Sequence, residues 1–472
     1  MATGLLGVSL TGLAAAQAGI RTAQHNISNI NTPGFRRQEV NYSSLTPDQA
    51  GASFYGTGVG VTTVRNLYSQ FQDSQVLLNQ AQLSRNEALS TQASQIDSLT
   101  GNPNSGLSSA MNAFFDAAQT VASDPASNVA RQVMLSAGSN LVSRFNTLAT
   151  SLDDLRKGTN RDIATTVTRI NTLAGQVAAM NGNITRFESG IGQLANDLRD
   201  QRDQLVGELN KLVNITPVQQ GDGTYNLFIG NGQPLVVGAS VTPMVSIPDT
   251  TNPGFDVPAF NLAGGSQMPL DASIISGGKL GGLLAARESV LMPARADLDT
   301  LAFELATQFN AQHTVGFDKS GAAGINFFTD LTTLATPPKG AAFGMSMNIA
   351  MNDPDLIAAS ATAPGSPGDN TNALLLAGLQ TAPNTVNGSD TFFSFYAQLV
   401  SRTATVASEA DIGVAAFETL TRISTQAQQS VSGVNLDEEA TNLIRFQQAY
   451  QASARAMQIA SGLFDDLISS LR

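Results

Sequence analysis

The residues of this chain that could carry out acid–base or metal chemistry are few and scattered. Its 472 residues include two histidines, His25 and His313, and no cysteine. A histidine binds a metal or shuttles protons when carboxylates or further ligands surround it, and neither histidine has such neighbours at a suitable spacing. We interpret both as ordinary polar or capping residues. The missing cysteines exclude disulfides, thiolate metal sites and cysteine catalysis.

Paired acids and clustered glycines are the remaining candidates for chemistry. Adjacent carboxylates can act as general acid and base, and such groups occur at residues 153–154, 437–439 and 465–466. All three groups lie in helical sequence, where exposed faces and helix caps account for them. The glycines of segment 56–60 lack the GxGxxG spacing and the βαβ context of a nucleotide loop, which favours a bulge or tight turn. The sequence therefore predicts a protein that is not an enzyme, with no catalytic residue, no metal site and no cofactor.

Composition narrows the class of protein further. The net charge is −12 and no cluster of Lys and Arg is present, which argues against nucleic acid as a partner. No run of about 18 apolar residues occurs, so we expect no membrane span. Segment 5–18 has some apolar character of a signal peptide but no preceding Lys or Arg, and we expect no cleavage. Because only 13% of residues are charged, polarity comes from Ser, Thr, Asn and Gln, which suits surfaces that pack against copies of themselves.

Two apolar stripes, one at each end of the chain, dominate the predicted elements. Both repeat every seven residues, the spacing of a helix that packs against another helix. The N-terminal stripe contains Leu6, Leu13, Ile20, Ile27 and Ile30. The C-terminal stripe contains Leu436, Leu443, Phe446, Tyr450, Met457, Phe464, Leu467 and Leu471. We predict that the two ends pair as a coiled coil and that these residues form an assembly interface with identical subunits.

Residues near the two stripes support this pairing. Small side chains that would let the helices approach closely are those of Ala16, Ala23, Ser453 and Ala460. The last helix is predicted to open with a capping box, in which Asn435 caps the helix and Glu438 reaches back to it.

The middle of the chain is predicted to contain a long helical bundle followed by a small β domain. From residue 70 to 212 the pattern is helical. An apolar seam in this stretch runs through Ile163, Ile170, Val177, Ile184 and Ile191, with Leu173, Met180, Phe187 and Leu194 three residues further on. Residues 215–279 are rich in Gly, Pro, Val and Thr and contain two hairpin turn signals, at 221–223 and 230–232.

These patterns divide the chain into four expected parts, and the fold class is mainly α with an inserted β domain. An inner domain combines residues 1–50 with 433–472. A helical bundle combines residues 51–214 with 280–330 and 390–432. A β-rich outer domain spans 215–279, and residues 331–389 form a loop-rich segment that we interpret as a reduced outer domain.

Several segments resemble one protein family. Segment 26–35, which includes Asn29, Asn31, Thr32, Pro33, Gly34 and Phe35, resembles the N-terminal motif of bacterial flagellar rod, hook and hook-associated proteins. Segments 432–439 and 442–452 are similar to the C-terminus of the hook-associated protein 1 family. Interior segments that agree with this family are 56–64, 222–236, 281–284 and 309–313.

The resemblance implies an axial structural subunit of the bacterial flagellum at the hook–filament junction, secreted by type III export. The implied partners are further copies in a ring, the hook protein, a second hook-associated junction protein and an export chaperone on the C-terminal helix. One alternative is another axial protein, hook or distal rod, which should carry more β sequence between its ends. A second alternative is a secreted adhesin or hydrolase on an axial scaffold, for which the small β domain offers no convergent catalytic groups.

Overall fold

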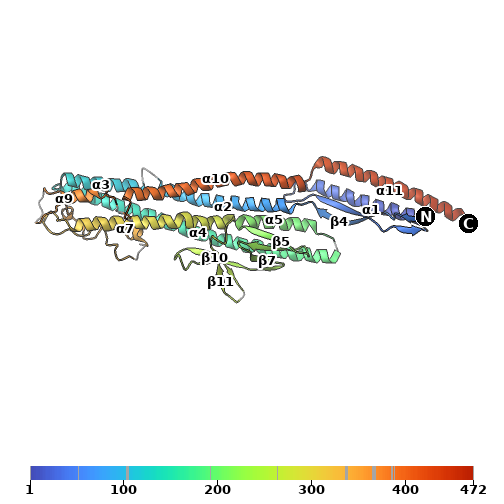
Figure 1. Cartoon of the computed structure of the whole chain (residues 1–472), viewed down its shortest axis with the longest axis horizontal. Coiled ribbons are helices and arrows are strands. Elements are labelled where there is room, and N and C mark those ends of the chain that lie inside the picture. The colour runs from blue at the N-terminus through green and yellow to red at the C-terminus, as the bar shows by residue number, and fades with distance from the viewer. Residues whose placement is uncertain are drawn as a thin grey trace.

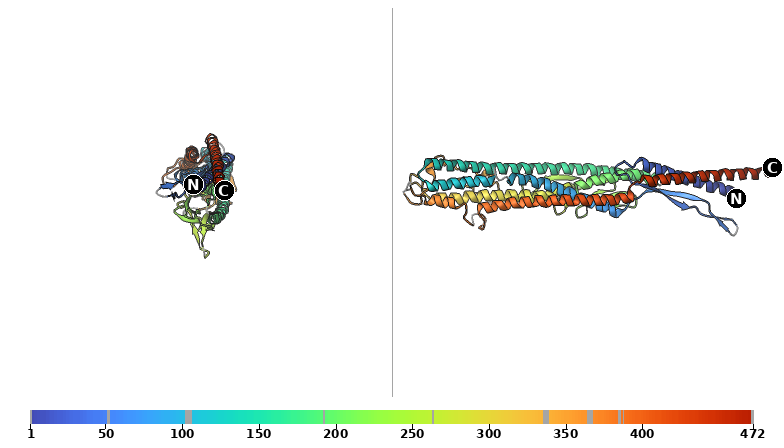
Figure 2. Two further views of the ribbon diagram at one scale, coloured as in Figure 1. Left: turned by 90° about the vertical axis from the view of Figure 1, so that its right-hand side faces the viewer. Right: turned by 90° about the horizontal axis from the view of Figure 1, so that it is seen from above.

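The chain forms a long rod of helices with both termini at the same end (Figure 1). The structure is a computed structural model that describes residues 2–50, 53–101, 106–191, 193–262, 264–334, 339–363, 368–383, 386 and 388–470. Two further views show that the rod is narrow in cross-section and that the terminal helices extend beyond its main body (Figure 2). None of the helices in the described ranges is long and apolar enough to cross a membrane.

The inner end of the rod is built from the two terminal helices and a β ribbon. Helix α1 (Ala2–Ser28) packs along α11 (Leu436–Ser470). Strand β1 (Gln38–Ser44) pairs antiparallel with β4 (Val59–Asn66), and both strands contact α1. The ribbon ends in a small hairpin formed by β2 (Asp48–Ala50) and β3 (Ser53–Tyr55).

The main body of the rod is a bundle of long helices. These are α2 (Gln70–Thr100), α3 (Leu107–Ser123), α4 (Asn128–Ile191), α5 (Asn196–Leu212), α6 (Gly278–Ala286), α7 (Met292–Thr314) and α10 (Phe392–Ser432). A π-helical turn, η1 (Arg287–Leu291), joins α6 to α7. The shorter elements near the distal end are α8 (Ala341–Gly344), the 3-10 turn η2 (Pro354–Leu356) and α9 (Thr371–Gly378).

The distal end has an aromatic core. The rings of Phe114, Phe309, Phe327 and Phe328 are fully buried, with centroids 4.9 to 5.7 Å apart. The loop-rich segment expected as a reduced outer domain packs into this same core, because its buried Ile357 belongs to the cluster. Its irregular backbone is held by buried polar side chains, as with the guanidinium of Arg131, which donates to the carbonyls of Pro125, Pro354 and Ile357.

Two small sheets cover the apolar seam of α4. One contains β5 (Ile215–Gln219), β6 (Tyr225–Ile229), β7 (Gln233–Val237) and β8 (Ser240–Val241), and the other contains β9 (Met244–Pro248), β10 (Asp256–Asn261) and β11 (Gln267–Pro269). The seam residues that they and α5 bury are Ile163, Ile170 and Val177. Ile184 is also fully buried. The predicted seam is wrong at its end, since Phe187 is 52% exposed and Leu194, 39% exposed, lies in the turn after α4 has ended. The covering strands end before this level.

The predicted fold class, mainly helical with paired terminal helices and a small β part, is confirmed. The boundary that we expected at residue 50 falls inside the β2–β3 hairpin, where Ala50 pairs with Ser53. Because β4 pairs with β1 and contacts α1, the structural unit at the inner end runs from residue 2 to 66 and includes α11.

Acid is expected to weaken the distal core through His313. This residue is fully buried, its Nδ1 lies 2.6 Å from the carbonyl of Ile325, and its Nε2 accepts from the backbone amide of Ala358. Burial lowers the pKa of His313 to about 4. Since the folded-state pKa lies below the unfolded value of about 6.5, stability is retained above that value and falls by up to about 3 kcal/mol as the pH drops towards 4.

Chemical unfolding of the full chain at pH 7 and at pH 4.5 measures this loss. The His313→Phe variant should unfold with about 2 kcal/mol less free energy at pH 7, because two buried polar groups lose their partner. The difference in unfolding free energy between the wild type and this variant should shrink from pH 7 to pH 4.5, because only the wild type loses the contribution of His313, whereas the contribution of Asp200 is common to both chains and cancels. A variant as sensitive to acid as the wild type would contradict this role of His313.

Candidate assembly interface and domain joint

The terminal helices pack along the predicted stripes, but incompletely. The stripe residues that are partly buried are Leu6, Leu13, Ile20, Ile27 and Ile30 on the N-terminal side, and Leu443, Phe446, Met457 and Phe464 on α11. Leu436 and Tyr450 remain 50% and 37% exposed. The side chain of Leu467 and the whole of Leu471 lie outside the described part of the structure. The α1–α11 pair therefore brings most of the predicted positions together without burying them fully.

Two glycines that sequence reasoning missed allow α1 and α11 to approach each other closely. A Cβ atom on Gly19 would lie 2.6 Å from the ring of Phe446, and one on Gly12 would lie 2.9 Å from Oγ of Ser453. Glycine is unfavourable inside a helix, so its presence here indicates that the close contact outweighs the loss of helix propensity. Both glycines and both partners repeat at seven residues, which is the signal in the sequence that could have identified them.

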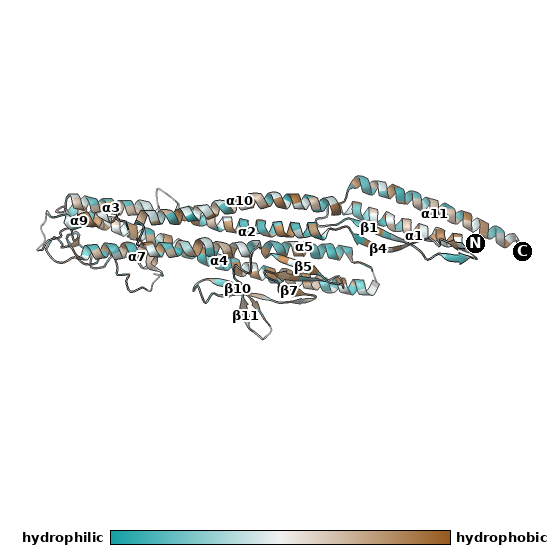
Figure 3. Cartoon of the chain, in the orientation of Figure 1, coloured by the Kyte–Doolittle hydropathy of each residue, from teal (hydrophilic) through white to brown (hydrophobic). Residues whose placement is uncertain are grey.

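Each terminal helix also presents apolar side chains to solvent. The exposed ones are Leu5, Val8 and Leu10 on α1, and Ile444, Ile459, Leu463 and Ile468 on α11. Figure 3 shows hydrophobic residues along both helices at this end of the rod. Exposed apolar side chains gathered on paired helices indicate a surface that further subunits can cover.

The motif of segment 29–35 turns the chain sharply at the end of α1. Asn29 donates to the carbonyl of His25, and Thr32 donates to Asn29. Gly34 has a φ of +75°, which an L residue rarely adopts, and a side chain there would collide with Gln204. The ring of Phe35 packs edge-on against His25, with centroids 5.3 Å apart.

Residues 29–37 connect α1 to β1 and are called the connector below. After the turn, Arg37 binds this connector to the start of α11. Its guanidinium lies 2.7 Å from the carboxylates of both Glu438 and Glu439, and its backbone amide donates to the carbonyl of Ser432. Glu439 is buried and also accepts from Asn26. The predicted capping box is therefore half right. Asn435 accepts from the amide of Asp437, but Glu438 binds Arg37.

Arg36 fastens the same connector to the rod body. Its guanidinium bridges Asp73 of α2 and Asp203 of α5, at 3.0 Å each, and its backbone amide donates to Asp200. Asp200 also accepts from Asn66, at 2.6 Å. Burial raises the pKa of Asp200 to about 7 and raises the pKa of Asp203, while the neighbouring Arg36 opposes both shifts.

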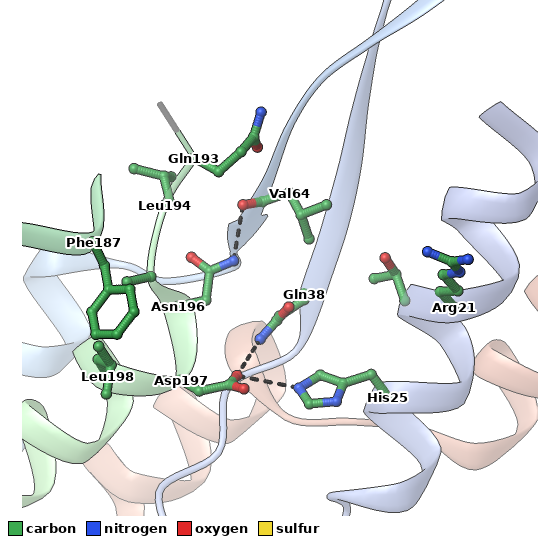
Figure 4. A pocket seen from close by; sticks show the side chains of 12 residues that line it. Arg21, His25, Gln38, Val64, Phe187, Gln193, Leu194, Asn196, Asp197 and Leu198 are labelled. Atoms are coloured by element: carbon green, nitrogen blue, oxygen red, sulfur yellow. Dashed lines mark hydrogen bonds and ion pairs between the residues drawn. The ribbon is translucent and has the colours of Figure 1, made fainter. Parts of the chain in front are cut away.

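An acidic stripe on α5 receives the contacts of Arg36 with the rod body other than that with Asp73, and sequence reasoning missed it. Asp197, Asp200 and Asp203 are spaced three residues apart and face the inner end of the rod. Asp197 accepts from Gln38 and pairs with His25, at 2.9 and 3.2 Å, as Figure 4 shows. The two arginines that directly follow the motif were the available signal for such carboxylates.

These contacts between the inner end, α2 and α5 form the joint between the inner end and the rod body. A groove of about 610 Å³ opens beside this joint (Figure 4). Its walls come from α1, the β ribbon and the turn between α4 and α5, and they contain Arg21, Val64, Phe187, Leu194 and Leu198. The groove is open to solvent. Its polar side chains, Gln38, Asn196 and Asp197, lie between the apolar Phe187, Leu194 and Leu198 on one side and Arg21 on the other (Figure 4).

The other candidates for chemistry are not brought together. Asp153 is bound by Arg156 and Lys157, and these hydrogen bonds lower its pKa to about 2. Gly58 lies in the ribbon with a φ of +118°, where it passes close to α1. Over the described residues, no group of three or more His, Asp or Glu side chains could hold a metal ion.

A family model described as the flagellar hook-associated protein FlgK helical domain matches residues 93–328, and one for the C-terminal part of flagellar basal body rod FlgEFG proteins matches residues 425–470. Flagellar hook-associated protein 1 of Escherichia coli K12 is 31% identical, over 98% of this chain and 99% of that protein. Its counterpart in Bacillus subtilis 168 is 30% identical, over 97% of this chain and 96% of that protein.

A solved structure has a similar fold. The flagellar hook junction protein FlgK from Burkholderia pseudomallei matches with a TM-score of 0.68 and 23% identity, over 76% of this chain and all of that one. The alignment with the Escherichia coli protein extends over 547 positions, more than the 472 residues here, so that relative carries segments that this chain lacks.

Proposed function

Because this chain belongs to the flagellar hook-associated protein 1 family, we propose that it is a structural subunit of the flagellum that joins the hook to the filament. It acts after export, as one of several copies arranged around the axis. The role is mechanical, and it is filled by surfaces that hold neighbouring subunits.

The observation that carries this proposal is the partly covered α1–α11 pair. Both termini lie at one end of the rod, and both helices keep exposed apolar residues such as Val8 and Ile459. Burying a side chain of this size is worth roughly 1.5–3 kcal/mol, so contact with neighbouring copies would add substantial stability to the inner end. The predicted stripe residues would then serve as the assembly interface.

The proposed partners follow the same logic. The family model shared with rod proteins covers residues 425–470, which supports contact between α11 and axial proteins with a similar terminal helix, such as the hook protein. A second junction protein would contact the opposite side of the ring. We also propose that an export chaperone covers the apolar face of α11 before secretion, when that face has no neighbouring subunit.

The alternatives have less support. A hook or distal rod protein is disfavoured by the family match to a helical domain over residues 93–328. An adhesin or hydrolase would use the β strands, but these pack on the seam of α4 and contribute to its core. Their role there is structural.

Immunogold labelling of purified flagella tests the proposed function. We expect the label to be confined to the boundary between hook and filament, and deletion of the gene to release filaments from intact hooks. Label distributed along the hook or the filament, or absent from flagella, would contradict the proposal. The rod-protein alternative predicts label below the hook.

A further inference from the structure

One apolar side chain at the distal end of the rod stands almost wholly in solvent. Ile349 is 94% exposed, and Ala350 beside it is exposed as well. The surrounding sequence, residues 340–352, contains no charged residue. A single exposed apolar residue is common on protein surfaces, so its meaning depends on how it is held and on what lies opposite it.

The turn that carries this side chain, residues 348–351, is fixed to the core, and we call it the distal turn. The backbone amide of Met351 donates to the carbonyl of Asn348, at 2.8 Å, and Met351 is buried. The side-chain oxygen of Asn348 accepts from the amide of Ala350, and its side-chain nitrogen donates to the carbonyl of Asn326. Because the turn is already ordered, it would lose little conformational entropy on binding a partner.

A groove of about 590 Å³ lies between α3 and α4 at the same end of the rod, opposite the termini (Figure 1). We call it the α3–α4 groove. Small side chains such as Ala110 and Ala113 line it, and Val129 and Val133 of α4 are 74% and 50% exposed there. The described residues that line it are all uncharged. An apolar groove with exposed valines is suited to receive an apolar side chain of a partner.

The distal turn and the groove lie at the same level of the rod. The chain enters the turn beside Gly138 of α4, where an added Cβ would lie 3.1 Å from Sδ of Met347. It leaves the turn towards Pro354, which lines the groove together with Asn128. The turn therefore lies between the levels of Asn128 and Gly138, and the groove follows α4 over residues 128–140.

The distal turn and the groove face different sides of the rod. Met347 packs on the side of α4 that carries Gly138, whereas the groove opens on the side that carries Val129. These two α4 residues are nine positions apart, about two and a half turns of helix, so they point in opposite directions. A chain therefore cannot place Ile349 in its own groove.

A second copy of the chain fits the groove better than a charged partner does. Each copy carries a net charge of −12, so copies repel one another unless they meet through uncharged surfaces, and the turn and the groove are both uncharged. Their placement also suits copies related by rotation about an axis. Each rod then presents its turn to one neighbour and its groove to the other, at equal levels.

We propose that the distal turn of one copy inserts Ile349 into the α3–α4 groove of the adjacent copy in the ring. This inference rests on the proposed function, because it requires several copies arranged around the flagellar axis. The contact is heterologous, joins equal levels of neighbouring rods and closes on itself when the ring is complete. It buries Ile349 against Val129 and Val133, and it lies at the opposite end of the rod from the α1–α11 pair.

Disulfide cross-linking tests this contact directly, because the chain contains no cysteine. Ala350 lies beside Ile349 in the distal turn, and Ser136 is exposed in the groove. We combine Ala350→Cys with Ser136→Cys, isolate flagella that carry this variant as the only copy, and oxidise them. The expected product is a ladder of covalent dimers and higher oligomers under non-reducing conditions. A mixture of the two single variants should stop at dimers, because each chain then carries half of the contact.

Matched variants separate this contact from chance collisions. Ala350→Cys combined with Ser189→Cys should give no ladder, because Ser189 is exposed near the other end of α4, about 80 Å of helix from Ser136. Adding Ile349→Ser to the first pair should lower the yield roughly tenfold, the change in affinity expected when burial of one isoleucine is lost. Val315→Ser should leave the yield within about twofold, because Val315 is equally apolar and 65% exposed but belongs to neither surface.

The other outcomes reject the proposal. Monomers alone, in flagella that carry the chain at the junction, would overturn this contact and leave the proposed function intact. A ladder whose yield is unchanged by Ile349→Ser would overturn Ile349 as the inserted residue. A cross-link to a protein of different mass would overturn the second copy as the occupant. Absence of the wild-type chain from flagella would contradict the proposed function, and this inference with it.

Discussion

Gly19→Leu is expected to abolish incorporation of the chain into flagella. In the structure even a Cβ atom at residue 19 would lie 2.6 to 2.7 Å from three ring atoms of Phe446. A leucine must therefore push α1 and α11 apart, and overpacking of this kind costs about 1–3 kcal/mol, occasionally more. Separation of the helices would also expose the buried Ala23 and Ala460 on either side of the contact. Because every copy in the ring carries the change, the loss of stability in the α1–α11 pair is repeated in every subunit of the assembly.

The measurement is the amount of chain in purified flagella, together with motility. Gly175→Leu is the matched control, because residue 175 lies inside α4, away from the paired terminal helices, with no atom within 4 Å of an added Cβ. It should assemble normally. Phe446→Ala should partly restore assembly of the Gly19→Leu variant by removing the ring that the leucine meets. Normal incorporation of Gly19→Leu alone would show that the α1–α11 pair is not required for assembly.

The pairing of the two ends could be predicted because it depends on a regular apolar repeat. A seven-residue apolar repeat indicates a helix with one apolar face, whatever that face packs against. The stripes therefore identified α1 and α11 and the faces on which they pair. Ala16, Ala23 and Ala460 were recognised as small and are buried. Gly12 and Gly19 were missed because glycine ordinarily indicates a turn, and only the facing helix shows why it is needed here.

The joint could not be predicted in the same way. Its contacts link the connector after α1 to α2, α5 and α11, so the partners of Arg36 and Arg37 are up to 402 residues distant in the sequence. An acidic residue on a helix usually faces solvent, and the sequence of α5 gives no sign that Asp200 and Asp203 are buried. Likewise, the seam of α4 predicted burial of Phe187, because a helical repeat does not show where the covering strands end.

Arg36→Gln is expected to loosen the joint between the inner end and the rod body. The side chains of Arg36, Asp73 and Asp203 are 15%, 21% and 15% exposed, so removal of the cation leaves two largely buried carboxylates with weaker support, from Gln428 on Asp73 and from Arg202 on Asp203. A fully unpaired buried charge costs roughly 3–5 kcal/mol, and the remaining partners make the cost here smaller. Arg65→Gln is the control, because Arg65 lies nearby and its pair with Glu39 is more than half exposed, where such pairs are worth little.

The pH dependence of this defect distinguishes loss of charge balance from loss of packing. Burial already raises the folded-state pKa of Asp200 to about 7, above its unfolded value, so its protonation favours the closed joint at low pH and is lost as the pH rises through 7. Without Arg36, closure of the joint should depend more steeply on pH.

Spin labels on Gln24→Cys and Gln193→Cys, which flank the joint, measure its closure as a distance distribution in the full chain. We expect a broad distribution for Arg36→Gln at pH 8 and a narrow one at pH 5. Adding Asp203→Asn should narrow the distribution at pH 8, because it removes one of the two carboxylates that Arg36 had neutralised. A distribution that stays broad at both pH values would mean that Arg36 acts through packing. A distribution that stays narrow at pH 8 would show that Arg36 is not needed to hold the joint closed.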